Sequence, residues 1–391
     1  MKRALAFVAA IAVMMLVAGG AVVAVTNTAR RRSGELQWPR GLGTLEEFSR
    51  AYPKADTTPA ARRLLELARP LSIDLTPSTR STEPVHADVG AYVRSELGSG
   101  ALAIATPSPA VVEFLTAHET ELDALRDHLL HDTRIGWTID PRADEQVPLP
   151  NFIGHLQTGR LLIVRALLRA RGGDARAWLD LEAAAALERS IAARPELISQ
   201  LIALALARAV NAAAWKLPMP APPWFVAAGR VDRERLLLRG LQYEAWRLWR
   251  YGTLTGDLRF GPAGVLFERA AAAKVSLELR DTAVELSQIT SCGFDGDAYF
   301  RARTSNLPRW NVFMRSTLPE FGKTFARVRR FAAEREAVAN ALRLRAAQPM
   351  QSQSRCSDGA WLVESGRLRF TRDIPRSSPS EMPLTLVISA P

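Results

Sequence analysis

The 391-residue chain is poor in the residues that build metal sites and disulfide frameworks, since it has two cysteines and five histidines. This scarcity excludes a cysteine-rich zinc module and a disulfide-dense miniprotein. Four catalytic or phosphate-binding motifs are also absent: G-x-x-x-x-G-K-[ST], G-x-S-x-G, H-E-x-x-H and C-x-x-C. We therefore expect no cofactor and no metal ion, and the sequence leaves open whether the protein is an enzyme.

Lysine is scarce as well, so the basic character of the chain comes almost entirely from arginine, beside a high alanine content. The formal net charge is +11, and it is unevenly distributed. Residues 1–195 carry 23 basic and 22 acidic side chains, whereas residues 196–391 carry 28 and 18. A basic second half favours an anionic partner such as a lipid surface. We expect no nucleic acid partner, because the chain has the features of an exported, tethered protein.

Long apolar runs are absent except at the N-terminus, where residues 4–25 contain no charged side chain. A helix of this length spans a hydrocarbon core of roughly 30 Å. We predict a transmembrane anchor over residues 1–32, a single pass, and a body on the outer, periplasmic side. The alternative is a cleaved signal peptide and a secreted protein. Basic residues flank the run on both sides, so the charge pattern leaves its orientation open.

The two cysteines, Cys292 and Cys356, allow two interpretations. In an exported protein they can form a disulfide, which would stabilise the fold by about 3–4 kcal/mol in the loop-entropy model. Alternatively, they are two separate thiols that pack as small buried side chains.

Beyond the anchor, the pattern predicts a tether at residues 33–58 with one short helix at 45–51. A helical body follows at 59–348 and a small β tail at 349–391. The clearest part of the body is a run of three helices at 150–171, 174–194 and 195–216. Their connections are so short that neighbouring helices must pack side by side, roughly antiparallel.

The end of the chain changes from helical to strand patterning. A long helix is predicted at residues 318–347, with a capping box formed by Thr317 and Glu320. Two strands at 361–364 and 368–370 flank a Ser-Gly turn, which is typical of a β-hairpin, and a third strand is expected within 384–389. The predicted fold class is mostly α: an N-terminal transmembrane helix, a multi-helix bundle or irregular helical array, and a small C-terminal β-hairpin appendage.

The segment from Leu149 to Lys216, with its run RPELISQLI at 194–202, resembles a poorly characterised group of bacterial single-pass membrane-anchored helical proteins. The sequences CGFD at 292–295 and CSDGAW at 356–361 fit the same group. The resemblance implies a membrane-anchored helical protein of the cell envelope. It implies no established activity, so it transfers no functional residues.

Two polar groups are candidates for chemistry. The histidines of the segment 118–131 do not form a metal site within one helix, because His128 lies about 15 Å along the axis from His118. Asp295 and Asp297 form the second group, and paired carboxylates can act as acid and base. Together with His155 they are the candidate site if the protein is an enzyme.

Arginines of the second half are candidates for contact with an anionic surface. Arg247 and Arg250 alternate with Tyr243, Trp246, Trp249 and Tyr251, a pattern found at membrane interfaces. At helical spacing, however, one face is formed by Leu238, Leu241, Ala245 and Trp249, which is typical of a core. Arg327 and Arg330 lie on the predicted long helix, which carries seven basic and three acidic residues.

The sequence therefore predicts a membrane-anchored helical envelope protein with a structural or interaction role, with an unknown protein partner among the options. The alternatives are an envelope enzyme whose site is assembled from distant residues and a binder of anionic membrane surface. An apolar, alanine-rich groove between the helices of residues 150–216 would favour the interaction role, with the protein acting as a binding module. A polar pocket that gathers Asp295 with a histidine or arginine would favour the enzyme.

Overall fold

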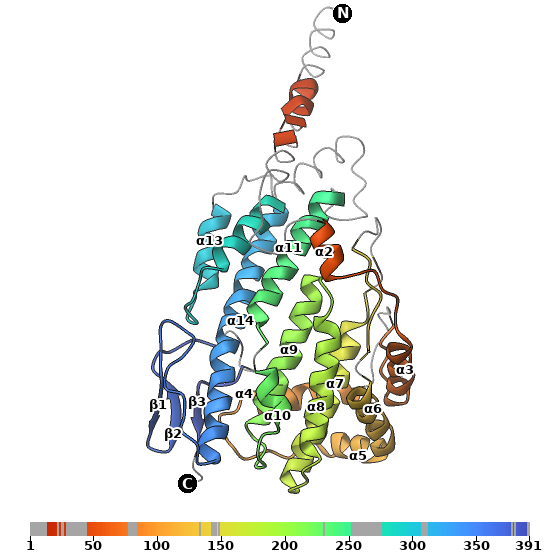
Figure 1. Ribbon diagram of the computed structural model, residues 1–391, viewed down its shortest axis with the longest axis vertical. Helices are drawn as coiled ribbons and strands as arrows, with labels where there is room; N and C mark the ends of the chain where they lie inside the picture. Colours follow the sequence, from red (N-terminus) through yellow and green to blue (C-terminus); the bar gives the residue numbers. More distant parts are fainter. Residues whose placement is uncertain are drawn as a thin grey trace, which may run out of the picture.

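The protein folds as a bundle of helices with a small antiparallel sheet beside its C-terminal helix (Figure 1). The structure is a computed structural model that describes residues 14–21, 23–24, 27–28, 45–76, 84–132, 134–141, 147, 149–229, 231–251, 276–305, 312–376, 378 and 381–388. This arrangement confirms a mostly helical fold with a small C-terminal sheet.

The first half of the bundle contains α2 (Leu45–Ala51), α3 (Pro59–Ala68), a 3-10 turn (Arg69–Leu71), α4 (Pro84–Gly98), α5 (Pro109–Ala117), α6 (Glu119–His131), α7 (Phe152–Arg171) and α8 (Ala177–Ala192). The second half contains α9 (Leu197–Ala214), α10 (Pro223–Ala228), α11 (Arg233–Tyr251), α13 (Gly296–Ser305) and α14 (Val312–Arg345). Residues 276–286 are helical as well. The strands are β1 (Trp361–Glu364), β2 (Arg367–Phe370) and β3 (Thr385–Val387).

Helices α7, α8 and α9 form the centre of the body, and each packs on the other two. The Asn151 side chain caps α7 by accepting a hydrogen bond from the Gly154 N–H at 3.1 Å. Most of α7 is buried, and Leu161, Leu162 and Ile163 have no exposed surface. The helix is buried on nearly all sides, and its buried Arg165 and Arg169 are paired with Asp180 on α8. The predicted three-helix block at 150–216 is confirmed.

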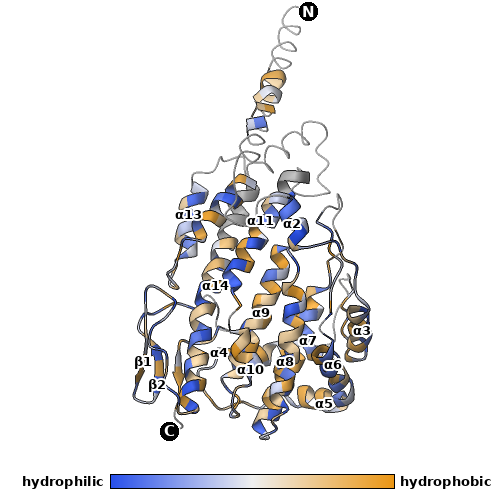
Figure 2. Ribbon diagram, viewed as in Figure 1, coloured by the Kyte–Doolittle hydropathy of each residue, from blue (hydrophilic) through white to orange (hydrophobic). Residues whose placement is uncertain are grey.

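Hydropathy follows this burial, since Figure 2 shows apolar stretches along α8 and α9 and recurrent polar residues along α14. Among the described residues, α9 is the one helix whose length and composition would let it cross a membrane, and 67% of it is buried in the body. It is therefore a core helix. Much of the predicted anchor at 4–25 lies outside the described residues. Its described part, which begins at Met14, is helical and exposed.

Helix α14 begins at Val312, earlier than predicted, and it runs through Thr317 and Pro319 without a break. The predicted capping box is therefore wrong. A cap contributes only about 1 kcal/mol, so a local signal of this kind is easily overridden when the preceding residues also fold as helix. Helix α13 packs tightly on α14 where Gly296 meets Gly322, because a Cβ on either glycine would overlap the backbone of the other.

The C-terminal tail forms the predicted hairpin, with Trp361 opposite Phe370 and Glu364 opposite Arg367. Ser365 and Gly366 both have positive φ, 49° and 70°, as a two-residue hairpin turn requires. Strand β3 adds to β2 as expected but is shorter than the predicted segment. The side chains of Leu368 and Leu386 are buried, and the sheet packs on α14.

A disulfide joins Cys292 to Cys356, with a Cα–Cα distance of 5.2 Å. It links the loop before α13 to the loop before β1. The Asp358 carboxylate reinforces this junction by accepting hydrogen bonds from the backbone N–H groups of Cys292 and Gly293, both at 3.1 Å. Of the two interpretations of the cysteines, the disulfide is therefore the one that the structure supports.

Helix α2 packs on the body, although it lies in the segment expected to act as a tether. Its Phe48 is fully buried, and its ring lies 5.5 Å from that of Tyr243 and 5.8 Å from that of Trp246. Tyr52 joins the same cluster. Tyr243 and Trp246 on α11 are thus core residues. On the face predicted from helical spacing, Leu238, Leu241 and Ala245 are buried as well.

Replacing both cysteines by serine should lower the free energy of unfolding by about 3–4 kcal/mol, because the open chain gains entropy when it unfolds. Chemical denaturation of the oxidised protein and of the double variant measures this difference. Two titratable thiols in the denatured, unreduced protein would contradict the disulfide.

Candidate functional site

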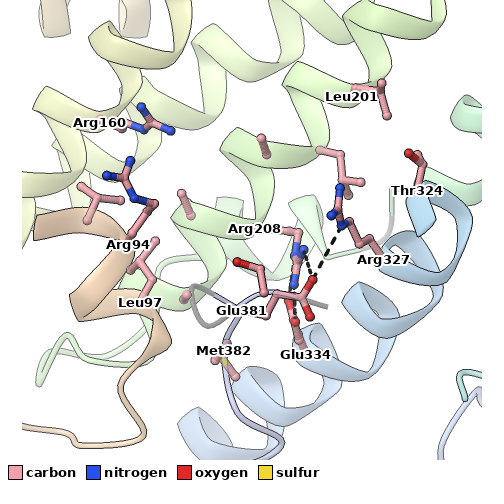
Figure 3. A pocket seen from close by; sticks show the side chains of 16 residues that line it. Arg94, Leu97, Arg160, Leu201, Arg208, Thr324, Arg327, Glu334, Glu381 and Met382 are labelled. Atoms are coloured by element: carbon pink, nitrogen blue, oxygen red, sulfur yellow. Dashed lines mark hydrogen bonds and ion pairs between the residues drawn. The ribbon is translucent and has the colours of Figure 1, made fainter. Parts of the chain in front are cut away.

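A cavity of about 400 Å³ lies between α4, α7, α9 and α14 and the segment that precedes β3 (Figure 3). This is within the size range of ligand pockets. Its lining is Val93, Arg94, Leu97, Arg160, Leu201, Leu204, Ala205, Arg208, Ala209, Ala212, Thr324, Arg327, Glu334, Ser378, Glu381 and Met382.

One wall of the cavity is a small-residue face of α9. Ala205, Ala209 and Ala212 are three and four positions apart, so they lie on the same side of the helix. Leu201 and Leu204 extend this face. Because alanine side chains end at Cβ, the wall leaves room between α9 and the facing helices. The groove is thus apolar and rich in alanine.

The floor of the cavity is a buried cluster of opposite charges. Arg208 donates to Glu334 at 2.6 Å and to Glu381 at 3.2 Å, and the side chains of both glutamates are 2% exposed. The Arg330 Nε lies 3.3 Å from a carboxylate oxygen of Glu334 and 3.1 Å from one of Glu381. Burial alone would lower the pKa of Arg208, but the two carboxylates raise it. The cluster thus places two guanidinium groups against two carboxylates.

The opposite side of the cavity carries a pair of arginines. Figure 3 shows the side chains of Arg94, from α4, and Arg160, from α7, pointing toward one another. Both Nη1 atoms lie 3.3 Å from the position that a Cβ on Gly90 would take. The distance between the two Nη1 atoms is therefore at most twice 3.3 Å. In the part of the chain that the structure describes, neither guanidinium pairs with a carboxylate. Burial, together with the charge of Arg94, lowers the pKa of Arg160.

The cavity holds groups for binding but few for catalysis. Its hydroxyls belong to Thr324 and Ser378, and no histidine, cysteine or lysine is among its described lining residues. Its two carboxylates are engaged by Arg208 and Arg330. Across the described ranges, no group of three or more His, Cys, Asp and Glu side chains could hold a metal ion.

The polar residues proposed for an enzyme lie apart from one another. Asp295 and Asp297 are exposed at the start of α13, where Asp295 accepts a hydrogen bond from the Ala298 N–H at 2.9 Å. His155 is in the first turn of α7, and Figure 1 shows α7 and α13 in different regions of the body. The structure does not bring the three residues together, and none of them lines the cavity.

His155 is fully buried, and the structure explains it as a core residue. Its Nδ1 lies 2.7 Å from the carbonyl oxygen of Asn151, and its ring packs edge-on against Trp137 at 4.7 Å. Its Nε2 is buried without a hydrogen-bond partner among the described atoms. Burial lowers the pKa of His155 to about 4, so the ring is neutral at pH 7.

The arginines proposed to contact an anionic surface have different locations. Arg247 is half-buried, and the Arg250 side chain lies outside the described residues. Arg327 lines the cavity. The expectation is wrong for Arg330, because its side chain is 4% exposed and its charge is satisfied by Glu334 and Glu381. Charge counting along a helix cannot show that acidic residues from elsewhere cover a basic one.

Sequence reasoning missed the residues that define the cavity, namely Arg94, Arg160, Arg208, Glu334 and Glu381. They lie on five separate segments, and none belongs to a motif. The alanine spacing of α9 was the one visible signal. Comparisons with protein-family models, with curated proteins and with solved structures found no match to this chain.

Replacing Glu381 by glutamine should destabilise the protein by about 3 kcal/mol, because the buried Arg208 and Arg330 would then share one carboxylate. Chemical denaturation measures the change. A matched control is Glu364→Gln, which removes an exposed pair with Arg369 and should cost less than about 1 kcal/mol. Equal effects of the two substitutions would contradict the buried charge cluster.

The buried His155 should make stability depend on pH. Its pKa is lower in the folded protein than in the unfolded chain, so the unfolded chain binds more protons between about pH 6.5 and pH 4. The free energy of unfolding should therefore fall as the pH falls through this window, by up to about 3 kcal/mol. His155→Gln should flatten the profile relative to wild type. His131→Gln, which changes an exposed histidine, should leave it unchanged.

Proposed function

We propose that the protein is a membrane-anchored binding module of the bacterial cell envelope. Residues 4–25 hold it in the membrane as a single pass, and the body lies on the outer side. The cavity between α4, α7, α9 and α14 takes a ligand, and the protein performs no chemistry on it. The observation that carries this proposal is the alanine-rich wall of α9, which keeps an apolar groove open between the helices of the bundle.

The anchoring part of the proposal is supported by the exposed apolar residues near the N-terminus. Met14, Met15, Leu16 and Val17 are each at least 65% exposed, in a helical segment that does not pack on the described body. Large apolar side chains left in water are costly, so a lipid environment is the natural one for them. The resemblance to membrane-anchored helical proteins points the same way.

The outer location is supported by the Cys292–Cys356 disulfide. Disulfides form and persist in oxidising compartments and are rare where thiols are kept reduced. The composition of the groove favours binding over catalysis. It is apolar and rich in alanine along α9, whereas a polar pocket that gathers Asp295 with a histidine or arginine is not found among the described residues.

The topology is tested with alkaline phosphatase fused after residue 60, because this enzyme is active only outside the cytoplasm. We expect an active fusion that stays in the membrane fraction. A fusion that is inactive would contradict the outer location, and one released as a soluble, shortened protein would show that the segment is cleaved.

The pocket is tested by filling it. Ala205 is exposed on the groove face of α9, so Ala205→Trp should occupy the cavity and leave the fold intact. We expect solvent extraction of the purified full-length protein, followed by mass spectrometry, to release a small molecule that this variant lacks. Ala302→Trp, at an exposed position on α13, is the matched control and should retain the molecule. Equal amounts in both variants, or no molecule in wild type, would count against a ligand pocket.

A further inference from the structure

Positive charges outnumber negative charges in the lining of the cavity, and most of the excess lies at one side. Its lining holds four arginines and two glutamates. Both glutamates are engaged on the floor by Arg208 and by Arg330, which lies just behind the lining. No carboxylate of the lining is therefore left for Arg94 and Arg160, on the opposite side. Arg327 also reaches Glu381, at 3.9 Å, so the floor has three arginines to two glutamates. The larger part of the positive surplus therefore lies in the pair Arg94 and Arg160.

The geometry of the pair suits an anion. Two guanidinium groups that face one another repel, and removal of one of them from water increases this cost. Gly90 lies beneath them, and because it has no side chain, both Nη1 atoms can lie 3.3 Å from the position that a Cβ would take. Arginine presents a planar set of donors that matches carboxylate and phosphate oxygens. An anion between the two groups would remove the repulsion.

The pair has apolar surroundings on its cavity side. Val93 and Leu97 lie next to Arg94 on the same helix, and the wall formed by Leu204, Ala205 and Ala209 continues from there. A small hydrated ion would leave this wall in contact with water. A molecule that has both a charged group and an apolar chain would satisfy the arginines and cover the wall.

We infer that the pocket binds an amphipathic anion, a carboxylate or phosphate monoester that carries an apolar chain. Its head group lies between Arg94 and Arg160, and its chain lies along Leu204, Ala205 and Ala209 on α9. This inference rests on the proposed function, since it names the class of ligand that the same cavity takes.

The test uses the full chain in nanodiscs of phosphatidylcholine, with empty nanodiscs as the blank. Isothermal titration calorimetry compares three probes: hexyl phosphate, hexanol and inorganic phosphate. Hexyl phosphate should bind with one site per chain, and each of the other two probes should bind at least tenfold more weakly. Arg94→Gln and Arg160→Gln should each weaken hexyl phosphate at least tenfold, because each removes hydrogen bonds to a charged group. Arg189→Gln, at an exposed position on α8, is the control and should change nothing.

The outcomes separate the ligand class from the pocket itself. Ala205→Trp should abolish binding of hexyl phosphate and of hexanol. If that variant loses hexanol while the two arginine variants bind hexyl phosphate as wild type does, the anionic class is overturned and the pocket stands. If inorganic phosphate binds as tightly as hexyl phosphate, the apolar part of the inference is overturned. If Ala205→Trp binds every probe as wild type does, both the ligand class and the proposed function are overturned. Thermal unfolding by circular dichroism checks that each variant is folded.

Discussion

Four charged side chains connect the parts of the molecule that surround the cavity: the half-buried Arg208 on α9, and the buried Arg330 and Glu334 on α14 and Glu381 before β3. Buried charges are tolerated only when each has a partner. The cluster therefore fixes how α14 and the C-terminal segment sit against α9. It also fixes where the cavity has its floor, because the guanidinium and carboxylate groups fill the space below the alanine face.

The same constraint explains why the tail is part of the body. Arg330 also donates to the backbone carbonyl of Met382 at 2.7 Å, so the residues before β3 are held on α14 by several hydrogen bonds. The Cys292–Cys356 disulfide secures the other end of the tail to the loop before α13. The segment before β3 thus closes the cavity on one side, and its position depends on charges that lie far apart in the sequence.

Local patterns identified much of the fold. The short connections around residues 172–176 and 193–196 required α7, α8 and α9 to be neighbours, and the Ser365-Gly366 turn set the register of β1 and β2. Much less of the candidate site could be predicted from the sequence. Asp295 and His155 look reactive in the sequence, yet one caps a helix at the surface and the other is a neutral core residue. Arg94 and Arg160 carry no local signal, because their importance comes from facing each other across two helices.

The sequence by itself determined the helical class, the order of the elements, the hairpin and the apolar N-terminal segment, because these follow from periodicity, turn chemistry and length. Tertiary structure alone decided which charges are paired. The surplus of arginine in the second half pointed toward a surface, but Arg330 is buried against two glutamates, whereas the pair without a carboxylate lies in the near-neutral first half. Charge pairing depends on the distances between segments of the folded chain, and a count of charges along the sequence does not give these distances.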